Sequence, residues 1–231
     1  MQKGKGMIKA VLIDIGNTLL DFHKCAPLAV KNAFNKYGIA YKEEYAPIFL
    51  KINDSLWQEI EGGTLTREEL FKIRFKRVFS ALDIDFNAEK IETEFRKELF
   101  NSAIAVDGAM DMLKYLSVKY KLYAASNGMS DQQINRLKIA GIFNYFTDFF
   151  LSEKLGYQKP DKRFFDGVFK ALKGILPSEI ALIGDSINAD IKGGLSCGIF
   201  TVWYNHNKNA PSIEIKPNFT IESLSEINKI L

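Results

Sequence analysis

The feature of this sequence that most restricts its fold is a series of short apolar runs that alternate with amphipathic helical stretches. Five runs have the length and composition of β-strands: 9–14, 120–126, 149–152, 180–184 and 199–204. Helices are expected between the later runs, at 107–118, 130–141, 161–174 and 188–196. Strands that alternate with helices in this way predict an α/β fold with a doubly wound, parallel, Rossmann-like sheet.

The segment 22–102 interrupts this alternation and has no convincing strand. Four helices are expected in it, at 25–37, 42–60, 66–82 and 87–102. Thr66 and Glu69 have the spacing of a capping box at the start of the third helix. Because the segment follows the first strand, it leaves the sheet at the carboxyl edge, where open α/β sheets bind ligands. We therefore expect a helical insertion placed to act as a lid.

The expected domain organisation follows from this insertion. The α/β domain consists of residues 7–21 and 103–231, and the helical domain consists of residues 22–102. Residues 1–6 are expected to be an N-terminal extension, because Met7 would also serve as a start.

Polar side chains follow the expected strands at the points where they end. Asp14 follows the first strand, and "SNG" at 126–128 ends the second. Lys159 lies in "GYQKPDK" after the third strand, and "GDSINAD" at 184–190 ends the fourth. Parallel strands bring all these ends to one edge of the sheet, so three carboxylates, a hydroxyl, an amide and an ammonium group are expected to converge.

This set of groups is suited to Mg²⁺ and a phosphate. Mg²⁺ prefers oxygen ligands and keeps waters that a phosphate can replace, and Ser and Lys side chains bind phosphate oxygens. Each motif alone is common as a turn or a helix cap. The prediction depends on finding all of them in order, each after its own strand.

Composition excludes several other classes of protein. The net charge of +3 over 231 residues, with scattered Lys and Arg, argues against a nucleic-acid partner. No stretch has the ~18 consecutive apolar residues of a membrane span. The two isolated thiols, Cys25 and Cys197, are typical of a cytoplasmic protein without disulfides. A monomer or a homodimer is expected.

The ordered motifs resemble the four motifs of the haloacid dehalogenase (HAD) superfamily of hydrolases, over essentially the whole chain. The helical insertion resembles the cap of one subfamily of these phosphohydrolases. Among the families of this superfamily, the pyrimidine 5′-nucleotidases are the most similar to this chain. The similarity lies in the segments "NDSLWQEIEGGTLTREEL", "KLGYQKPDKRFFD", "GDSINADIKGG" and "TVWYNHN".

This resemblance implies a role for each matching residue. Asp14 would be the nucleophile that takes up the phosphoryl group, and Lys159 would neutralise charge beside it. Ser126 and the backbone around Asn127 would bind the phosphoryl oxygens. The remaining roles concern the metal. Asp14 and Asp185 would bind Mg²⁺ through their side chains and Gly16 through its carbonyl, and Asp190 would hold metal-bound waters or Lys159. The implied substrate is a small phosphorylated metabolite, of which a nucleoside monophosphate is the best match.

One position departs from the family pattern. The first motif normally has a second Asp two residues after the nucleophile, which acts as the general acid and base, and here that position is Gly16. A positioned acid–base group contributes about 10²–10⁴-fold to the rate. Asn17 is adjacent but neutral. A glycine also tolerates a positive φ, and this second reason for Gly16 is left open.

Three interpretations of Gly16 are open: a slow phosphatase, an enzyme that takes its acid from elsewhere, or a catalytically weak or inactive relative that binds a ligand or partner. A phosphonatase-type enzyme would need a Schiff-base lysine from the insertion, for which Lys31, Lys51 and Lys72 are available. A dehalogenase would need no metal, and the presence of Asp185 and Asp190 argues against it. We favour the phosphatase with impaired acid–base chemistry.

The insertion contains candidate residues for substrate specificity. Asn53 and Trp57 lie four residues apart, on one face of an expected helix, and Arg74 and Phe75 lie on the next. An amide beside an aromatic ring is suited to binding a nucleobase, although aromatic residues at such positions commonly form the core. Phe22, which follows the motif that contains Asp14, likewise either contacts the substrate or forms part of the core.

Overall fold

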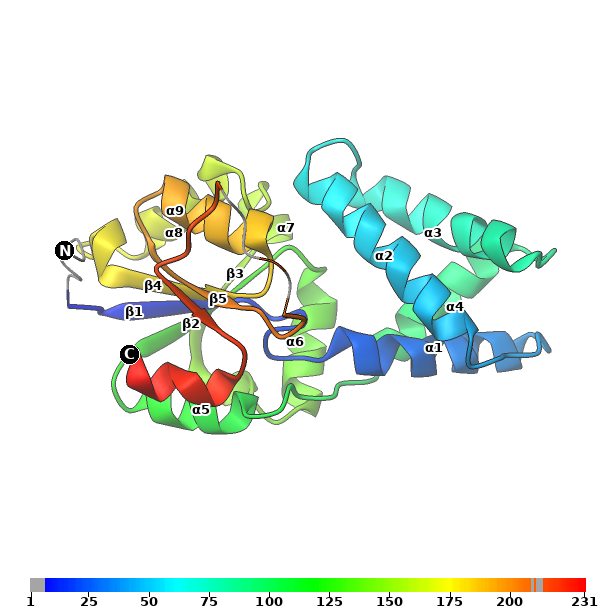
Figure 1. Cartoon of the computed structure of the whole chain (residues 1–231), viewed down its shortest axis with the longest axis horizontal. Helices are drawn as coiled ribbons and strands as arrows, with labels where there is room; N and C mark the ends of the chain where they lie inside the picture. The colour runs from blue at the N-terminus through cyan, green and yellow to red at the C-terminus, as the bar shows by residue number, and fades with distance from the viewer. Residues whose placement is uncertain (1–6, 209, 211–213) are drawn as a thin grey trace. The chain divides into compact units, whose positions relative to one another are not determined.

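The computed structural model describes residues 7–208, 210 and 214–231, so the expected N-terminal extension at 1–6 lies outside the described residues. The chain divides into two compact units (Figure 1). One contains the described residues up to Asp21 together with Ala105–Leu231, and the other is Phe22–Ile104. The second unit therefore extends two residues beyond the expected end of the insertion at 102.

The first unit, called here the α/β unit, is built on a six-stranded sheet in which every pairing is parallel. The strands lie in the order β3-β2-β1-β4-β5-β6. Their bounds are Ala10–Ile13 (β1), Lys121–Ser126 (β2), Phe146–Leu151 (β3), Ile180–Gly184 (β4), Phe200–Tyr204 (β5) and Phe219–Ile221 (β6). The chain runs outward from β1 to β3 and then returns to the other side of β1, which makes the β1–β4 boundary a topological switch point. The Rossmann-like prediction is confirmed.

Helices cover both faces of this sheet, which explains why β1 and β4 are apolar and buried along their whole length. Figure 1 shows α5 and the C-terminal η4 on one face and α8 and α9 on the other. The elements are α5 (Ala109–Ser117), α6 (Ser130–Ile139), α7 (Ser152–Leu155), α8 (Lys162–Ala171), α9 (Gly193–Ser196), and the short helices η1 (Phe143–Tyr145), η2 (Pro177–Glu179), η3 (Ile187–Lys192) and η4 (Leu224–Lys229).

Two edge strands differ from the expectation, and both differences have a physical cause. β3 begins at Phe146 rather than at 149, because Thr147 and Asp148 are exposed and hide the apolar pattern of the strand. β6 was not expected at all, because it is only three residues long and one of them is exposed. The helix expected at 188–196 is also divided into the π-helix η3 and the short α9.

The second unit, called here the helical unit, consists of α1 (Phe22–Lys36), α2 (Tyr45–Glu61), α3 (Arg67–Leu82) and α4 (Ala88–Phe100). Its core is rich in phenylalanine. The expected capping box is present, because Thr66 accepts from the Glu69 N–H and the Glu69 side chain accepts from the Thr66 N–H. In the described part of the chain, no helix combines the length and the apolar composition needed to cross a bilayer.

Candidate active site

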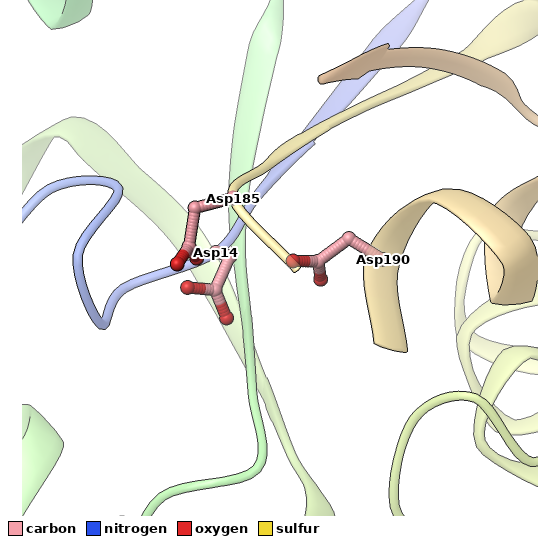
Figure 2. Close-up of side chains that lie close together, drawn as sticks. All are labelled: Asp14, Asp185 and Asp190. Carbon is pink, nitrogen blue, oxygen red and sulfur yellow. The ribbon is translucent and has the colours of Figure 1, made fainter. Parts of the chain in front are cut away.

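The carboxyl edge of the sheet brings together the polar residues that the sequence places after its strands. Asp14 directly follows β1, Ser126 is the last residue of β2, and Asp185 directly follows β4. Figure 2 shows the carboxylates of Asp14 and Asp185 close together, with Asp190 facing them from the helix that follows. One carboxylate oxygen from each of the three lies within 4.8 Å of the others. Three carboxylates this close together repel one another when they are all ionised, and a positive charge among them offsets this repulsion.

Lys159 supplies a positive charge at this point. Its side chain is only 1% exposed, and Nζ donates to Asp14 Oδ1 (2.8 Å), Asp190 Oδ1 (2.6 Å) and the carbonyl oxygen of Ala125 (2.6 Å). These three bonds use all the protons of an ammonium group. Burial alone would lower the pKa of Lys159, but the charges of Asp14 and Asp190 outweigh it and raise the pKa above its usual value. Lys159 therefore stays protonated at neutral pH.

The position of Lys159 is fixed by Asn127, whose side chain has a role that the sequence did not indicate. Asn127 Nδ2 donates to the carbonyl of Lys159, and Asn127 Oδ1 accepts from the Lys159 N–H, both at 2.8 Å. The two bonds fasten the loop after β3 to the end of β2. The backbone around Asn127 was expected to bind phosphate, which stays a prediction, and the side chain has the separate role of positioning the lysine.

Asp190 was expected to hold either metal-bound waters or Lys159, and the contacts favour the second role. Its Oδ1 accepts from Lys159, and its Oδ2 accepts from the N–H of Ser186 at 3.1 Å. The carboxylate lies against Gly184, where a Cβ would come within 2.7 Å of the Asp190 Cβ. Asp190 is close enough to the other carboxylates to be counted with a metal cluster, but both of its oxygens already have protein donors.

Asp185 is held by two residues that sequence reasoning missed. Thr18 Oγ1 donates to Asp185 Oδ1 at 3.2 Å, and Trp203 Nε1 donates to the backbone carbonyl of Asp185 at 2.9 Å. Thr18 lies in the loop after β1 and Trp203 in β5. No spacing rule pairs these residues with Asp185, because the contacts depend on the order of strands in the sheet.

Gly16 is not required by the backbone conformation. The positive φ in this loop belongs to Asn17 (54°), so the possibility that Gly16 is needed for a positive φ is wrong. A Cβ built on Gly16 would meet no atom within 4 Å beyond its chain neighbours. Two backbone hydrogen bonds close the loop, from the Asn17 N–H to the Leu20 carbonyl and from the Leu20 N–H to the Ile15 carbonyl. The Gly16 carbonyl takes part in neither bond. The loop therefore has room for a Cβ at position 16.

These donors fit a small divalent cation. The clustered carboxylates of Asp14 and Asp185 offer hard oxygen atoms, the type of ligand that Mg²⁺ prefers; the part expected of the Gly16 carbonyl stays a prediction. Thr18 orients Asp185, as an outer partner of a metal ligand commonly does.

The candidate specificity residues pack within the helical unit. Asn53 is 2% exposed, and its Oδ1 accepts from Arg74 Nη1 at 2.9 Å. Trp57 is partly buried against Leu56 and Ile60, and Phe22 packs against the phenylalanine-rich core. These contacts show all three residues packed within the helical unit, and their role in substrate specificity stays a prediction.

The lysines considered for Schiff-base chemistry are all on the surface of this unit. Lys31, Lys51 and Lys72 are exposed, and Lys31 pairs with Glu43 at 3.2 Å. A Schiff-base lysine is typically activated by a site that removes water or by a second cation. The described contacts of these lysines provide neither condition.

The geometry agrees with the comparisons to known proteins. Residues 8–198 match the model of the haloacid dehalogenase-like hydrolase family. The chain is a member of that family. YfnB of Bacillus subtilis, a HAD hydrolase, is 33% identical over 96% of this chain and 95% of its own length. The pyrimidine 5′-nucleotidase PynA of Streptococcus pneumoniae is 31% identical over 95% of this chain and 93% of its own. The resemblance stated from the motifs is confirmed.

Solved structures show the same HAD fold. The structure of Bacillus subtilis YfnB bound to magnesium superposes with a TM-score of 0.92, at 33% identity, over 98% of this chain and 99% of that one. An L-2-haloacid dehalogenase of Xanthobacter autotrophicus reaches a TM-score of 0.74 at 17% identity, over 97% and 98% of the two chains, and this likeness concerns the fold alone.

Proposed function

We propose that this HAD hydrolase removes the phosphoryl group from small phosphorylated metabolites with the help of Mg²⁺, and that nucleoside 5′-monophosphates are its substrate class. The observation that most supports the reaction is the meeting of Asp14, Asp185 and Lys159 at one edge of the sheet. The substrate class is supported by PynA and by YjjG of Escherichia coli, a pyrimidine 5′-nucleotidase that is 27% identical over 96% of both chains.

In the proposed reaction Asp14 attacks phosphorus, and an aspartyl phosphate forms as the bond to the leaving oxygen breaks. Water then attacks the same phosphorus and releases inorganic phosphate, which restores the carboxylate. Splitting one difficult hydrolysis in two is the usual benefit of such a nucleophile. Lys159 neutralises charge beside Asp14, and Ser126 donates to a phosphoryl oxygen. A Mg²⁺ ion, held by Asp14, Asp185 and the Gly16 carbonyl, would supply further positive charge to the phosphoryl oxygens.

The proposal includes slow chemistry, because position 16 has no side chain to move a proton. The oxygen of a nucleoside leaves poorly unless it is protonated, and the water of the second step needs a base. Nitrophenolate leaves without a proton, so the first step should proceed with p-nitrophenyl phosphate. The second step still lacks its base, and the phosphoenzyme should therefore accumulate.

The helical unit is proposed to be a lid that selects the substrate. Its insertion after β1 supports this, because the loop that leads into it also contains Gly16 and Thr18. The structure of the magnesium-bound relative YfnB is described as revealing interdomain movement, which supports a mobile lid in this chain as well. The free thiols of Cys25 and Cys197 support a cytoplasmic location.

The test is a rapid-mixing experiment with p-nitrophenyl phosphate and Mg²⁺. We expect a burst of nitrophenol that approaches one equivalent per chain, followed by slow turnover, and intact mass after an acid quench should show one added phosphoryl group. The Asp14→Asn variant should show no burst. A phosphoryl group on another residue, or linear release from the first turnover at ordinary rates, would contradict this mechanism.

The metal site is tested separately by calorimetry. Asp185→Ala should lose Mg²⁺ affinity because it removes a charged ligand. Asp111→Ala is the control, because that carboxylate is 88% exposed on α5 and should leave affinity unchanged. Equal affinity in the two variants would remove Asp185 from the metal site.

A further inference from the structure

The hydroxyl of Ser126 is held in a way that determines where its proton goes. Ser126 is 2% exposed, and its Oγ accepts two hydrogen bonds, from the N–H of Gly128 (3.1 Å) and from Nε2 of Gln133 (3.0 Å). A serine oxygen has two acceptor lone pairs and one proton to donate. Both lone pairs are engaged here, so the proton is directed to a third group.

Ser126 and the proposed nucleophile are linked through Lys159. Ser126 follows Ala125, whose carbonyl accepts from the same Lys159 ammonium that binds Asp14. Strands β1 and β2 are parallel neighbours, so a phosphoryl group attached to Asp14 would bring oxygen acceptors to the same edge of the sheet at which β2 ends in Ser126.

Gln133 reaches Ser126 only because residue 128 is a glycine. Gln133 lies in the first turn of α6, is 6% exposed, and packs its side chain over Gly128. A Cβ on Gly128 would come within 2.9 Å of both Cγ and Cδ of Gln133. Gly128 has no positive φ, so close approach and not backbone conformation explains the glycine.

The burial of Gln133 is not explained by its other contacts. Among the described residues, its Oε1 has no hydrogen-bond partner, although the atom is buried. A buried amide with one unsatisfied end is less stable there than an apolar side chain of the same shape. The bond to Ser126 is what distinguishes glutamine from methionine at this position.

We propose that Gln133 is a positioning residue of the phosphate site, which fixes the Ser126 hydroxyl so that it donates to a phosphoryl oxygen of the substrate. The proposal rests on the proposed function and adds a residue outside the motifs through which that function was found. Gln133 itself does not touch the substrate.

The experiment measures the affinity of the Mg²⁺-loaded protein for orthophosphate by calorimetry, together with kcat and KM for p-nitrophenyl phosphate. Gln133→Met keeps the length and removes the donor, and about a tenfold loss of phosphate affinity is expected, the size of one lost hydrogen bond. Gln133→Glu places an acceptor beside Ser126, so the hydroxyl should turn toward residue 133. The loss of phosphate affinity in Gln133→Glu should be larger than in Gln133→Met, and it should diminish as the pH falls and the new carboxyl group takes up a proton.

The matched controls are Gln132→Met and Gln132→Glu at the neighbouring, less buried position, and both should bind phosphate like the wild type.

A double-mutant cycle separates positioning from general damage. If Gln133 acts through Ser126, then Gln133→Met should have no further effect in a Ser126→Ala background. Gly128→Ala, which displaces the Gln133 side chain, should reproduce the loss by a second route if Gln133→Met folds poorly. Additive losses in the double mutant would overturn the positioning role of Gln133, and so would wild-type affinity in both Gln133→Met and Gly128→Ala. The proposed function would stand in either case, provided that the wild-type protein binds phosphate. Absence of phosphate binding in the Mg²⁺-loaded wild type would overturn both.

Discussion

At the scale of single residues, the site depends on a few side chains that each hold another in place. Asn127 holds the backbone of Lys159, Lys159 bridges Asp14 and Asp190, and Thr18 holds Asp185. Gly16 stands out in this arrangement because it has no side chain, no positive φ and no neighbour within 4 Å of an added Cβ. The loop conformation does not require a glycine there, and the proposed effect of Gly16 is chemical.

Gly16→Asp is predicted to raise nucleotidase turnover by about 10²–10⁴-fold, the contribution of a positioned acid–base group. Because a Cβ at this position meets no obstacle, the variant should fold like the wild type. The measurement is phosphate release from nucleoside monophosphates. With p-nitrophenyl phosphate, the burst of nitrophenol should give way to steady release. Gly16→Asn, nearly the same in shape, is the matched control and should restore nothing. Equal rates for Gly16→Asp and the wild type would mean that another group supplies the proton.

At the scale of secondary-structure elements, the sequence predicted well those parts whose pattern is local. The buried strands β1 and β4 and the capping box of α3 were located from apolar runs and residue spacing. The edge strands β3 and β6 were shortened or missed, because an exposed edge needs no continuous apolar run.

Contacts between elements were outside the reach of the sequence patterns. The bond from Trp203 to Asp185 exists because β5 lies beside β4, and the bond from Gln133 to Ser126 exists because α6 packs back over Gly128. Sequence motifs locate the residues at the strand ends. They do not show which side chains from other parts of the sequence hold those residues in position. The contact of Asn53 with Arg74 is a further example, because residue spacing within one helix does not indicate a bond to the next helix.

The buried ion pair of the helical unit gives a prediction at this scale. Arg74 donates to Glu92 through Nη2 (2.6 Å) and Nε (3.1 Å), and its guanidinium carbon lies 4.6 Å from the centre of the Phe95 ring. Burial raises the pKa of Glu92, and the charge of Arg74 opposes this shift. Arg74→Met leaves a buried carboxylate without its partner and should cost the helical unit about 3–5 kcal/mol.

The two tryptophans allow this cost to be measured within one unit. Trp57 lies in the helical unit and Trp203 in the α/β unit, so in a Trp203→Phe background the fluorescence reports the unfolding of the helical unit alone. The control is Arg77→Met, which removes a surface pair with Glu59 and should cost no more than about 1 kcal/mol. Adding Glu92→Leu to Arg74→Met should recover much of the lost stability. The idea fails if Arg74→Met and Arg77→Met unfold at the same urea concentration.

At the scale of the whole molecule, the proposed chemistry and the proposed substrate selection belong to different units. The proposed nucleophile, metal ligands and phosphate-binding groups all belong to the α/β unit. The two ends of the helical unit leave this body side by side, because Leu20 pairs with Ala105 and the Val106 N–H donates to the Leu19 carbonyl at 2.9 Å. The α/β unit can therefore close its own chain without the insertion.

Replacing Phe22–Ile104 with a short Gly–Ser linker between Asp21 and Ala105 is predicted to leave a folded α/β unit that binds Mg²⁺ but no longer discriminates among phosphate esters. The reason is that the metal and phosphate groups remain, while the proposed lid is gone. Circular dichroism and Mg²⁺ calorimetry establish that the shortened protein is intact. The Gly16→Asp background provides enough turnover to compare kcat/KM for nucleoside monophosphates with that for simple phosphate esters.

The expected result is a ratio of kcat/KM values near one after deletion, against a clear preference for nucleotides in the full-length Gly16→Asp protein. The control for the linker is an insertion of the same Gly–Ser sequence at Gly62–Gly63, in the loop that follows α2, which leaves the helical unit in place and should keep the preference. If the shortened protein binds Mg²⁺ and still prefers nucleotides, the α/β unit itself selects the substrate. The helical unit would then need another role, such as excluding water from the slowly hydrolysed aspartyl phosphate.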